Sequence, residues 1–389
     1  MRGHAIAATL WLALLLLASA LPAVAGSDIV FDRPRASGVF GEPVAFSTTF
    51  RSEQPPRRVE LLTQVPGGEG QGVEFAAVER TGDDTWEATA YRSGHIVPNT
   101  RWDYRFRVIN DDGSATGPVA THRYADERLE WQVLEGDRVN VWWHEGGDGF
   151  GRQALGIAEE ALASASELLG VGEMDPIDFY IYSDTREFRE AMGPATRENV
   201  GGQAHPSIRT LFGLIEPRQI GSDWIEELIT HELVHLVFHE AVDNPYQYPP
   251  RWLNEGLAVY VSRGYTEGDR LQVGGAARAG TIIPLEGLGG NFPTRTTRSG
   301  LAYAESVSAV GFFVETYGEE QLVKLITSFA DGTGPNEAFI AATGDDLATF
   351  DEAWLDSLGA EPPEPYGPRE SEPGPVPDAW AAQAGALLR

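Results

Sequence analysis

Two histidines and a glutamate stand close together in the segment His231-Glu232-Leu233-Val234-His235. On an α-helix, residues four apart lie one turn from each other on one face, so both imidazoles can bind the same metal ion. Glu232 lies beside them, where its carboxylate can reach a water on the metal without binding the metal itself. This spacing predicts a metal centre that activates water for hydrolysis.

The helix that carries these residues is expected to run from Ser222 to Val242. Ser222 or Asp223 can cap its start, and acidic residues occupy its first turn. Most of the remaining positions are apolar, which predicts a buried helix. Burying two imidazoles and a carboxylate there is costly unless a partner satisfies them.

A third ligand is expected from a second helix. Pro249-Pro250 can open a helix, and the segment 251–260 that follows places Glu255 twenty residues after His235. Gly256 allows the two helices to approach closely. The chain has no cysteine, so a transition-metal site must use His, Asp and Glu ligands. Three protein ligands with a fourth position left for water are typical of catalytic zinc.

The HELVH motif followed by Trp252-Leu253-Asn254-Glu255-Gly256 resembles the gluzincin metallopeptidases, which include thermolysin and the aminopeptidase N family. The similarity to the bacterial peptidase MA-like domain extends further along the chain, and the resemblance covers about Arg138 to Leu358. It implies an α+β zincin-like fold and one Zn²⁺ per chain. The implied metal ligands are His231, His235 and Glu255, and the implied general base is Glu232.

The resemblance also suggests a role for Tyr303. In aminopeptidase N relatives, a tyrosine that opens a helix after the zinc glutamate stabilises the transition state, and Tyr303 occupies a similar place. The alternative is an ordinary core tyrosine. His239 is expected to support the site or to be a core histidine rather than a ligand, and His205 is a weaker candidate for contacting substrate.

The sequence departs from related families at several positions. A metzincin would have Gly at position 238 and His at 241, where this chain has Phe238 and Ala241, so that family is rejected. The Gly-x-Met-Glu-Asn motif that binds a free amino terminus is absent, and its neighbourhood at 201–205 lacks the carboxylate. An endopeptidase is therefore expected rather than an aminopeptidase. Val259 replaces the Asp that supports an imidazole in thermolysin-like enzymes, so this support must come from elsewhere.

Four segments are expected along the chain. Residues 1–25 resemble a cleaved signal peptide, with Arg2, the apolar run 10–17 and Ala23-Val24-Ala25, although a retained membrane anchor is the alternative. Residues 27–126 predict an all-β sandwich, whose stretch 98–113 resembles fibronectin type III or immunoglobulin-like domains. The peptidase domain, with a mainly helical C-terminal half, is expected at 127–360, and a disordered tail rich in Pro and Glu at 361–389.

The formal net charge of −29 argues against nucleic acid or anionic lipid as partners. After the first segment no other long apolar stretch occurs, so no stable membrane insertion is expected once the signal is removed. The signal-like segment 1–25 predicts a secreted protein, extracellular or in a bacterial cell envelope. The sequence indicates no particular oligomeric state.

Three functions fit these observations. The first is a peptidase that cleaves a protein or peptide substrate lying extended along the edge of a strand at 209–214. The second is a zinc hydrolase of a non-peptide amide. The third is a non-catalytic binding or scaffold protein with a relict metal site, against which the intact Glu232 argues, because a structural site has no need of that carboxylate.

Overall fold

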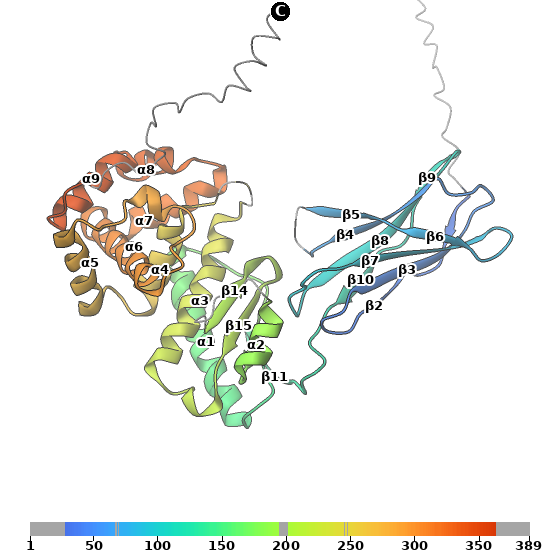
Figure 1. Cartoon of the computed structure of the whole chain (residues 1–389), viewed down its shortest axis with the longest axis horizontal. Helices are drawn as coiled ribbons and strands as arrows, with labels where there is room; N and C mark the ends of the chain where they lie inside the picture. Colours follow the sequence, from blue (N-terminus) through green and yellow to red (C-terminus); the bar gives the residue numbers. More distant parts are fainter. Residues whose placement is uncertain are drawn as a thin grey trace, which may run out of the picture. The chain divides into compact units, whose positions relative to one another are not determined.

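A computed structural model describes residues 28–66, 68, 70–193, 201–244, 246 and 248–362. The chain divides into two compact units between Glu127 and Arg128 (Figure 1). The expected signal peptide lies outside the described residues, as does nearly all of the expected tail. Within the described part of the chain, no helix is long and apolar enough to cross a membrane.

Two antiparallel sheets make up the described part of the N-terminal unit. One sheet has the order β1-β3-β7-β6, with β2 paired to β3, and its strands are β1 (Val30–Phe31), β2 (Arg35–Ser37), β3 (Val44–Arg51), β6 (Ala77–Arg80) and β7 (Thr85–Arg92). The other has the order β10-β8-β4-β5, with β9 paired to β8, and its strands are β4 (Arg58–Gln64), β5 (Gln71–Phe75), β8 (Arg101–Asn110), β9 (Gly113–Thr116) and β10 (Ala120–Arg123).

The two sheets pack through alternating apolar side chains. Every second residue of β3 and of β8 is buried, as the two-residue period of a half-buried strand requires. Phe46 of β3 meets Trp102 and Tyr104 of β8 edge to face, with ring centroids 6.0 and 4.9 Å apart. The expectation of a mainly β N-terminal region is therefore confirmed, and its sheets form a sandwich.

The C-terminal unit begins with a mixed sheet in the order β11-β12-β13-β15-β14. Its strands are β11 (Gln132–Glu135), β12 (Val139–Trp143), β13 (Ile177–Tyr182), β14 (Gly202–His205) and β15 (Thr210–Leu214). The three central strands are parallel, and each outer strand is antiparallel to its neighbour. The expectation that the strand at 209–214 offers an edge to substrate is wrong, because β15 pairs on both sides and β14 is the edge strand.

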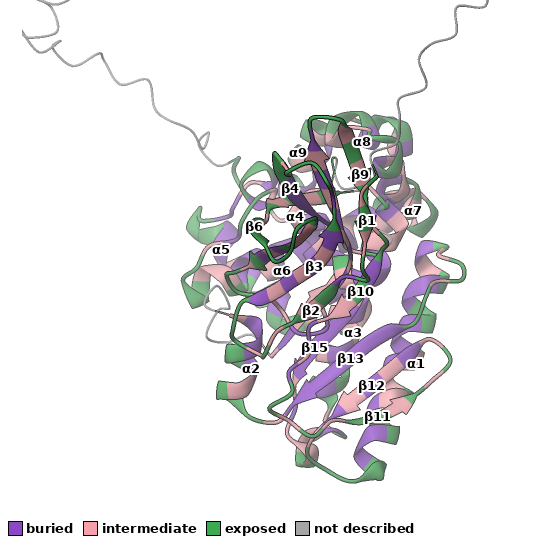
Figure 2. Cartoon of the chain, turned by 90° about the vertical axis from the view of Figure 1, so that its right-hand side faces the viewer, coloured by how far each residue is buried: buried purple, intermediate pink, exposed green. Residues whose placement is uncertain are grey.

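Two long helices pack together beside this sheet (Figures 1 and 2). Helix α1 (Asp148–Leu169) ends at Gly170, which adopts the left-handed conformation that glycine tolerates best. A Cβ added to Gly151 would lie 2.4 Å from the indole of Trp143, so this glycine lets α1 approach β12. Helix α3 (Asp223–Val242) packs along α1 and contacts β14 and β15.

Helix α2 (Thr185–Met192) lies between β13 and β14 in the chain. The remaining described helices follow the sheet, which confirms the expectation of a helical C-terminal part. They are α4 (Arg251–Ser262), α5 (Glu267–Ala279), α6 (Thr296–Tyr317), α7 (Glu319–Thr327), α8 (Pro335–Thr343) and α9 (Leu347–Ser357). Short 3₁₀ turns occur at η1 (Pro206–Ile208), η2 (Pro217–Gln219), η3 (Leu285–Leu288) and η4 (Ser328–Asp331).

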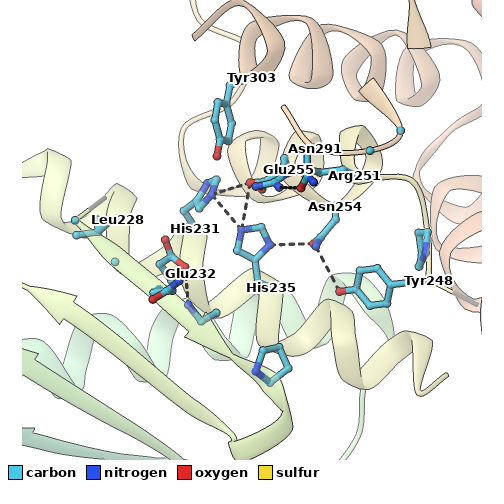
Figure 3. A pocket seen from close by; sticks show the side chains of 18 residues that line it. Leu228, His231, Glu232, His235, Tyr248, Arg251, Asn254, Glu255, Asn291 and Tyr303 are labelled. Atoms are coloured by element: carbon cyan, nitrogen blue, oxygen red, sulfur yellow. Dashed lines mark hydrogen bonds and ion pairs between the residues drawn. The ribbon is translucent and has the colours of Figure 1, made fainter. Parts of the chain in front are cut away.

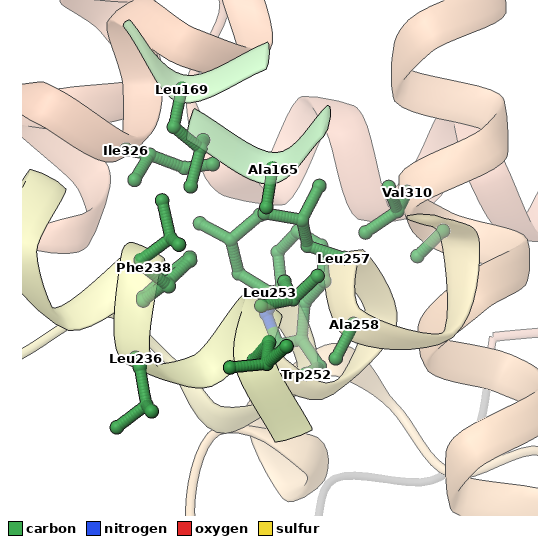
Figure 4. Packing of buried hydrophobic residues seen from close by; sticks show 14 of the residues in the cluster. Ala165, Leu169, Leu236, Phe238, Trp252, Leu253, Leu257, Ala258, Val310 and Ile326 are labelled. Atoms are coloured by element: carbon green, nitrogen blue, oxygen red, sulfur yellow. The ribbon is translucent and has the colours of Figure 1, made fainter. Parts of the chain in front are cut away.

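Helices α3, α4 and α6 pack around a common core (Figure 4). Phe238 of α3, Leu257 of α4 and Val310 of α6 are each fully buried within it. Helices α4 and α6 approach each other closely at Gly256 of α4, where an added Cβ would lie 2.5 Å from the carbonyl oxygen of Ser306. The position of α4, and therefore of every side chain it carries, depends on this glycine.

Substituting Gly256 with alanine is expected to destabilise the protein. The new methyl group would collide with backbone rather than with a flexible side chain, so α4 must move at a cost of about 1–3 kcal/mol. Gly156→Ala is the matched control, since it lies on an exposed face of α1 with open space around it and should gain about 0.5–1 kcal/mol. Urea unfolding followed by circular dichroism measures both, and equal stability of the two variants would contradict this packing.

Glu305 of α6 is a fully buried carboxyl group away from the pocket described below. Burial raises its pKa to about 8, against the lowering effects of the Ile283 N–H, 3.2 Å from both carboxyl oxygens, and of the charge of Arg298. A group whose pKa is raised on folding stabilises the fold below its unfolded pKa. This contribution is lost progressively as the pH rises from the unfolded pKa to about 8.

Glu305→Gln should therefore stabilise the protein increasingly from pH 5 to pH 8, by on the order of 3 kcal/mol at the upper end. Thermal unfolding of the wild type and the variant across this range checks the result. Glu315→Gln, an exposed position on the same helix, should give no such trend. A difference between Glu305→Gln and the wild type that does not change with pH would refute the prediction.

Candidate metal centre and active site

His231 and His235 lie one helical turn apart on α3, and both point into the same pocket (Figure 3). Their Nε2 atoms are 3.2 Å apart, and their rings stand perpendicular with centroids 4.8 Å apart. Both side chains are largely buried, with exposed fractions of 19% and 15%. The four-residue spacing on a straight helix thus directs two nitrogen donors at one point.

Glu255 of α4 completes this cluster from the facing helix. Its Oε2 atom lies 3.5 Å from Nε2 of His231 and 3.4 Å from Nε2 of His235. Among the described residues, these three form the group of His and acidic side chains that could hold a metal ion. Neighbouring donors of a tetrahedral zinc site lie about 3.3–3.5 Å apart, given zinc–donor distances of about 2.0–2.2 Å. The donor types and their spacing therefore fit zinc.

The electrostatics of the cluster favour a positive charge at its centre. Burial works against a charge on His235, but the hydrogen bond and the charge of Glu255 outweigh it and raise the pKa of His235 to about 9. Burial alone would raise the pKa of Glu255, yet the hydrogen bonds from His231 and His235 hold it well below its usual range. Such a carboxylate stays ionised, as a metal ligand must.

Asn254 orients one of the two imidazoles. Its Oδ1 atom lies 2.9 Å from Nδ1 of His235, and because an amide oxygen only accepts, Nδ1 keeps a proton and Nε2 is the nitrogen left to bind a metal in place of its own proton. The Asn254 amide donates in turn to the hydroxyl of Tyr248, at 3.4 Å. Asn254 thus supports an imidazole of the cluster, which the Val259 side chain cannot do.

Glu232 enters the same pocket without joining the cluster. Its Oε2 atom accepts a hydrogen bond of 3.0 Å from the backbone N–H of Ala204 in the edge strand β14. A Cβ added to Gly202 would lie 2.8 Å from Cγ of Glu232, so the strand can pass this side chain closely only because residue 202 is glycine. The edge strand therefore fixes the position of the carboxylate.

The pocket has a volume of about 910 Å³. Tyr303 lines it from α6, in the third turn of the helix rather than at its start, where the resemblance had placed it. Burial, followed by the charge of Glu255, raises the pKa of Tyr303 to about 12, although Arg251 lowers it. Its phenol is therefore a hydrogen-bond donor at neutral pH. Its ring lies 6.3 Å from that of His231.

Two other histidines considered from the sequence lie outside the cluster. His239 is one turn beyond His235, with its ring 6.1 Å from that of Tyr248, and burial lowers its pKa. His205 ends β14 with its ring edge-on to Phe212, at 5.3 Å, and it is not among the described residues that line the pocket. The structure therefore gives neither residue a place at the cluster.

Sequence reasoning did not identify Arg251, Asn254 and Gly202 as parts of the site. Arg251 lies four residues before Glu255 on one helix, a spacing that predicts an ion pair, so that contact could have been found. The other two depend on tertiary contacts. Asn254 meets an imidazole of another helix, and Gly202 meets a side chain 30 positions away, neither of which follows from local spacing.

Comparison with solved structures finds an aminopeptidase N family protein from Idiomarina loihiensis. The two chains share 10% sequence identity, with a TM-score of 0.44, and the similarity covers 82% of this chain and 74% of that one. No curated protein matches the sequence.

Residues 157–360 match the Peptidase MA superfamily. The matched region makes up slightly more than half of the chain. It starts within α1 and ends just after α9, so it includes the helices that carry the histidines, both glutamates and Tyr303. The chain belongs to the Peptidase MA superfamily.

Proposed function

We propose that this protein is a zinc-dependent peptidase whose metal is held by His231, His235 and Glu255. The observation that carries the proposal is the convergence of two imidazole nitrogens and one carboxylate oxygen, 3.2–3.5 Å apart, in an open pocket. Membership of the Peptidase MA superfamily supports the reaction class. A bound zinc ion supplies Lewis acidity, which polarises a carbonyl group and lowers the pKa of water.

Glu232 is proposed to be the general base and then the general acid. It accepts the proton of the attacking water and delivers it to the leaving amine. Its hydrogen bond to the Ala204 N–H holds one carboxyl oxygen in place and leaves the other for the water. Because Glu232 is not one of the three cluster residues, it is free to exchange protons.

Tyr303 is proposed to stabilise the oxyanion that forms during attack. Its raised pKa keeps the hydroxyl protonated, and Figure 3 shows the hydroxyl directed toward the cluster. A preorganised donor at this point contributes about 3 kcal/mol to transition-state stabilisation.

The substrate is proposed to be a peptide that lies along the outer edge of β14. This strand pairs with β15 on one side, and the backbone N–H of Ala204 points to the pocket on the other. Among the described lining residues, the only carboxylates are Glu232 and Glu255, and both have other roles. We therefore propose cleavage within a chain rather than recognition of a free amino terminus.

The N-terminal sandwich is proposed to be an immunoglobulin or fibronectin type III-like accessory domain that recruits or positions the substrate. The Peptidase MA match lies outside it, and it has a core of its own. The amino-terminal apolar run fits an export signal, and secretion is therefore part of the proposal.

Removing an imidazole from the cluster should abolish metal binding. His235→Ala is expected to lower the zinc content from about one ion per chain to near zero, because two remaining ligands hold zinc poorly. His239→Ala is the matched control, one turn further along α3, and should keep a full equivalent. Elemental analysis after dialysis measures both. Full zinc content in His235→Ala would exclude this residue as a ligand.

Glu232→Gln should retain zinc and lose peptidase activity by about 10²–10⁴-fold, since the amide cannot accept the proton of water. The readout is cleavage of casein and of a dye-labelled peptide library, with Glu240→Gln on the same helix as a control of unchanged activity. If Glu232→Gln cleaves as well as the wild type, the mechanism fails. Zinc binding without peptide cleavage by any sample would instead favour a non-peptide amide substrate or a scaffold role.

A further inference from the structure

Arg251 contacts the one oxygen of Glu255 that does not face the histidines. Its Nε and Nη2 atoms donate to Oε1 of Glu255 at 3.1 and 2.8 Å, whereas Oε2 faces the two imidazoles. The two carboxyl oxygens thus have separate partners (Figure 3). A planar guanidinium that reaches one oxygen with two donors resists rotation of the carboxyl group.

The guanidinium of Arg251 is itself held in place. The backbone N–H of Arg251 donates to the carbonyl of Gly289 at 3.0 Å, and the guanidinium carbon lies 5.0 Å from the ring centre of the buried Phe292. A further donor, Nη1, lies 3.5 Å from Oδ1 of Asn291. These contacts restrain the side chain that faces the cluster carboxylate.

We infer that Arg251 is a positioning residue that turns a single oxygen of Glu255 toward the metal. The inference rests on the proposed function, because it assumes that Glu255 is a metal ligand. Without the guanidinium, Oε1 would lose its partners in a largely buried place, and the carboxyl group could rotate or bind the metal through both oxygens. Either change would weaken the fit of the three donors to zinc.

The alternative is that the ion pair only stabilises helix α4. A comparable ion pair lies at the C-terminal end of α4, where Arg263 contacts Asp269. Arg263 and Arg251 are similarly exposed, at 28% and 33%, and both partner carboxylates are 9% exposed. Arg263 is not among the described residues that line the pocket. A purely structural role would make the two arginines equivalent.

The test measures zinc affinity by competition with a chromophoric chelator, using the full chain stripped of metal and zinc alone as the probe. Arg251→Met should weaken zinc binding by about 10- to 100-fold, the usual effect of removing a group that orients a ligand. Arg251→Lys should fall between this variant and the wild type, because it keeps the charge but not the paired donors. Arg263→Met should lower the melting temperature without changing zinc affinity.

Zinc affinity within twofold of the wild type in Arg251→Met would overturn the inference, as would an equal loss in Arg263→Met. If Arg251→Met does not fold, Arg251→Lys and Arg263→Lys give the same comparison, with only the first expected to weaken binding. Failure of the proposed function gives a different result. Wild-type protein that binds no zinc, or a His235→Ala variant that binds zinc normally, would refute the proposed function itself.

Discussion

A buried carboxylate held between a pair of imidazoles and a guanidinium is the interaction on which the rest of the C-terminal unit depends. Glu255 is only 9% exposed, and an isolated charge at such a place would be expensive. The imidazoles on one side and Arg251 on the other make the charge tolerable. The cluster therefore requires α3 and α4 to face each other at a fixed distance, and most of the fold serves that requirement.

The packing of α4 meets this requirement with little freedom. Gly256, next to Glu255, lets α4 lie directly on the backbone of α6, the helix that also carries Tyr303. Helix α3 packs on α1 and on the edge strand β14, whose Ala204 N–H donates to Glu232. The two histidines, the two glutamates and the tyrosine thus come from three helices. Helix α4 contacts both α3 and α6. A shift of any one helix would separate groups that must act together.

Local patterns were enough to predict α3, α4 and the pairing of His231 with His235, because all of these depend on residues close in sequence. They were also enough for the alternating strands of the N-terminal sandwich. The order of strands in the mixed sheet was not predictable in this way. Gly202–His205 has no strong strand pattern, yet it forms the edge, while the more strand-like Thr210–Leu214 lies inside the sheet. Which strand is the edge is decided by tertiary pairing, as is the contact between Asn254 and His235.

The central claim is that two imidazoles and one carboxylate share one zinc ion with room for solvent. X-ray absorption at the zinc edge of the purified protein measures the ligand shell directly. The geometry of the cluster predicts two imidazole nitrogens at about 2.0–2.1 Å and the remaining ligands as oxygen. A shell with three or more imidazoles, or one made of oxygen alone, would contradict the arrangement of His231, His235 and Glu255 around a single metal.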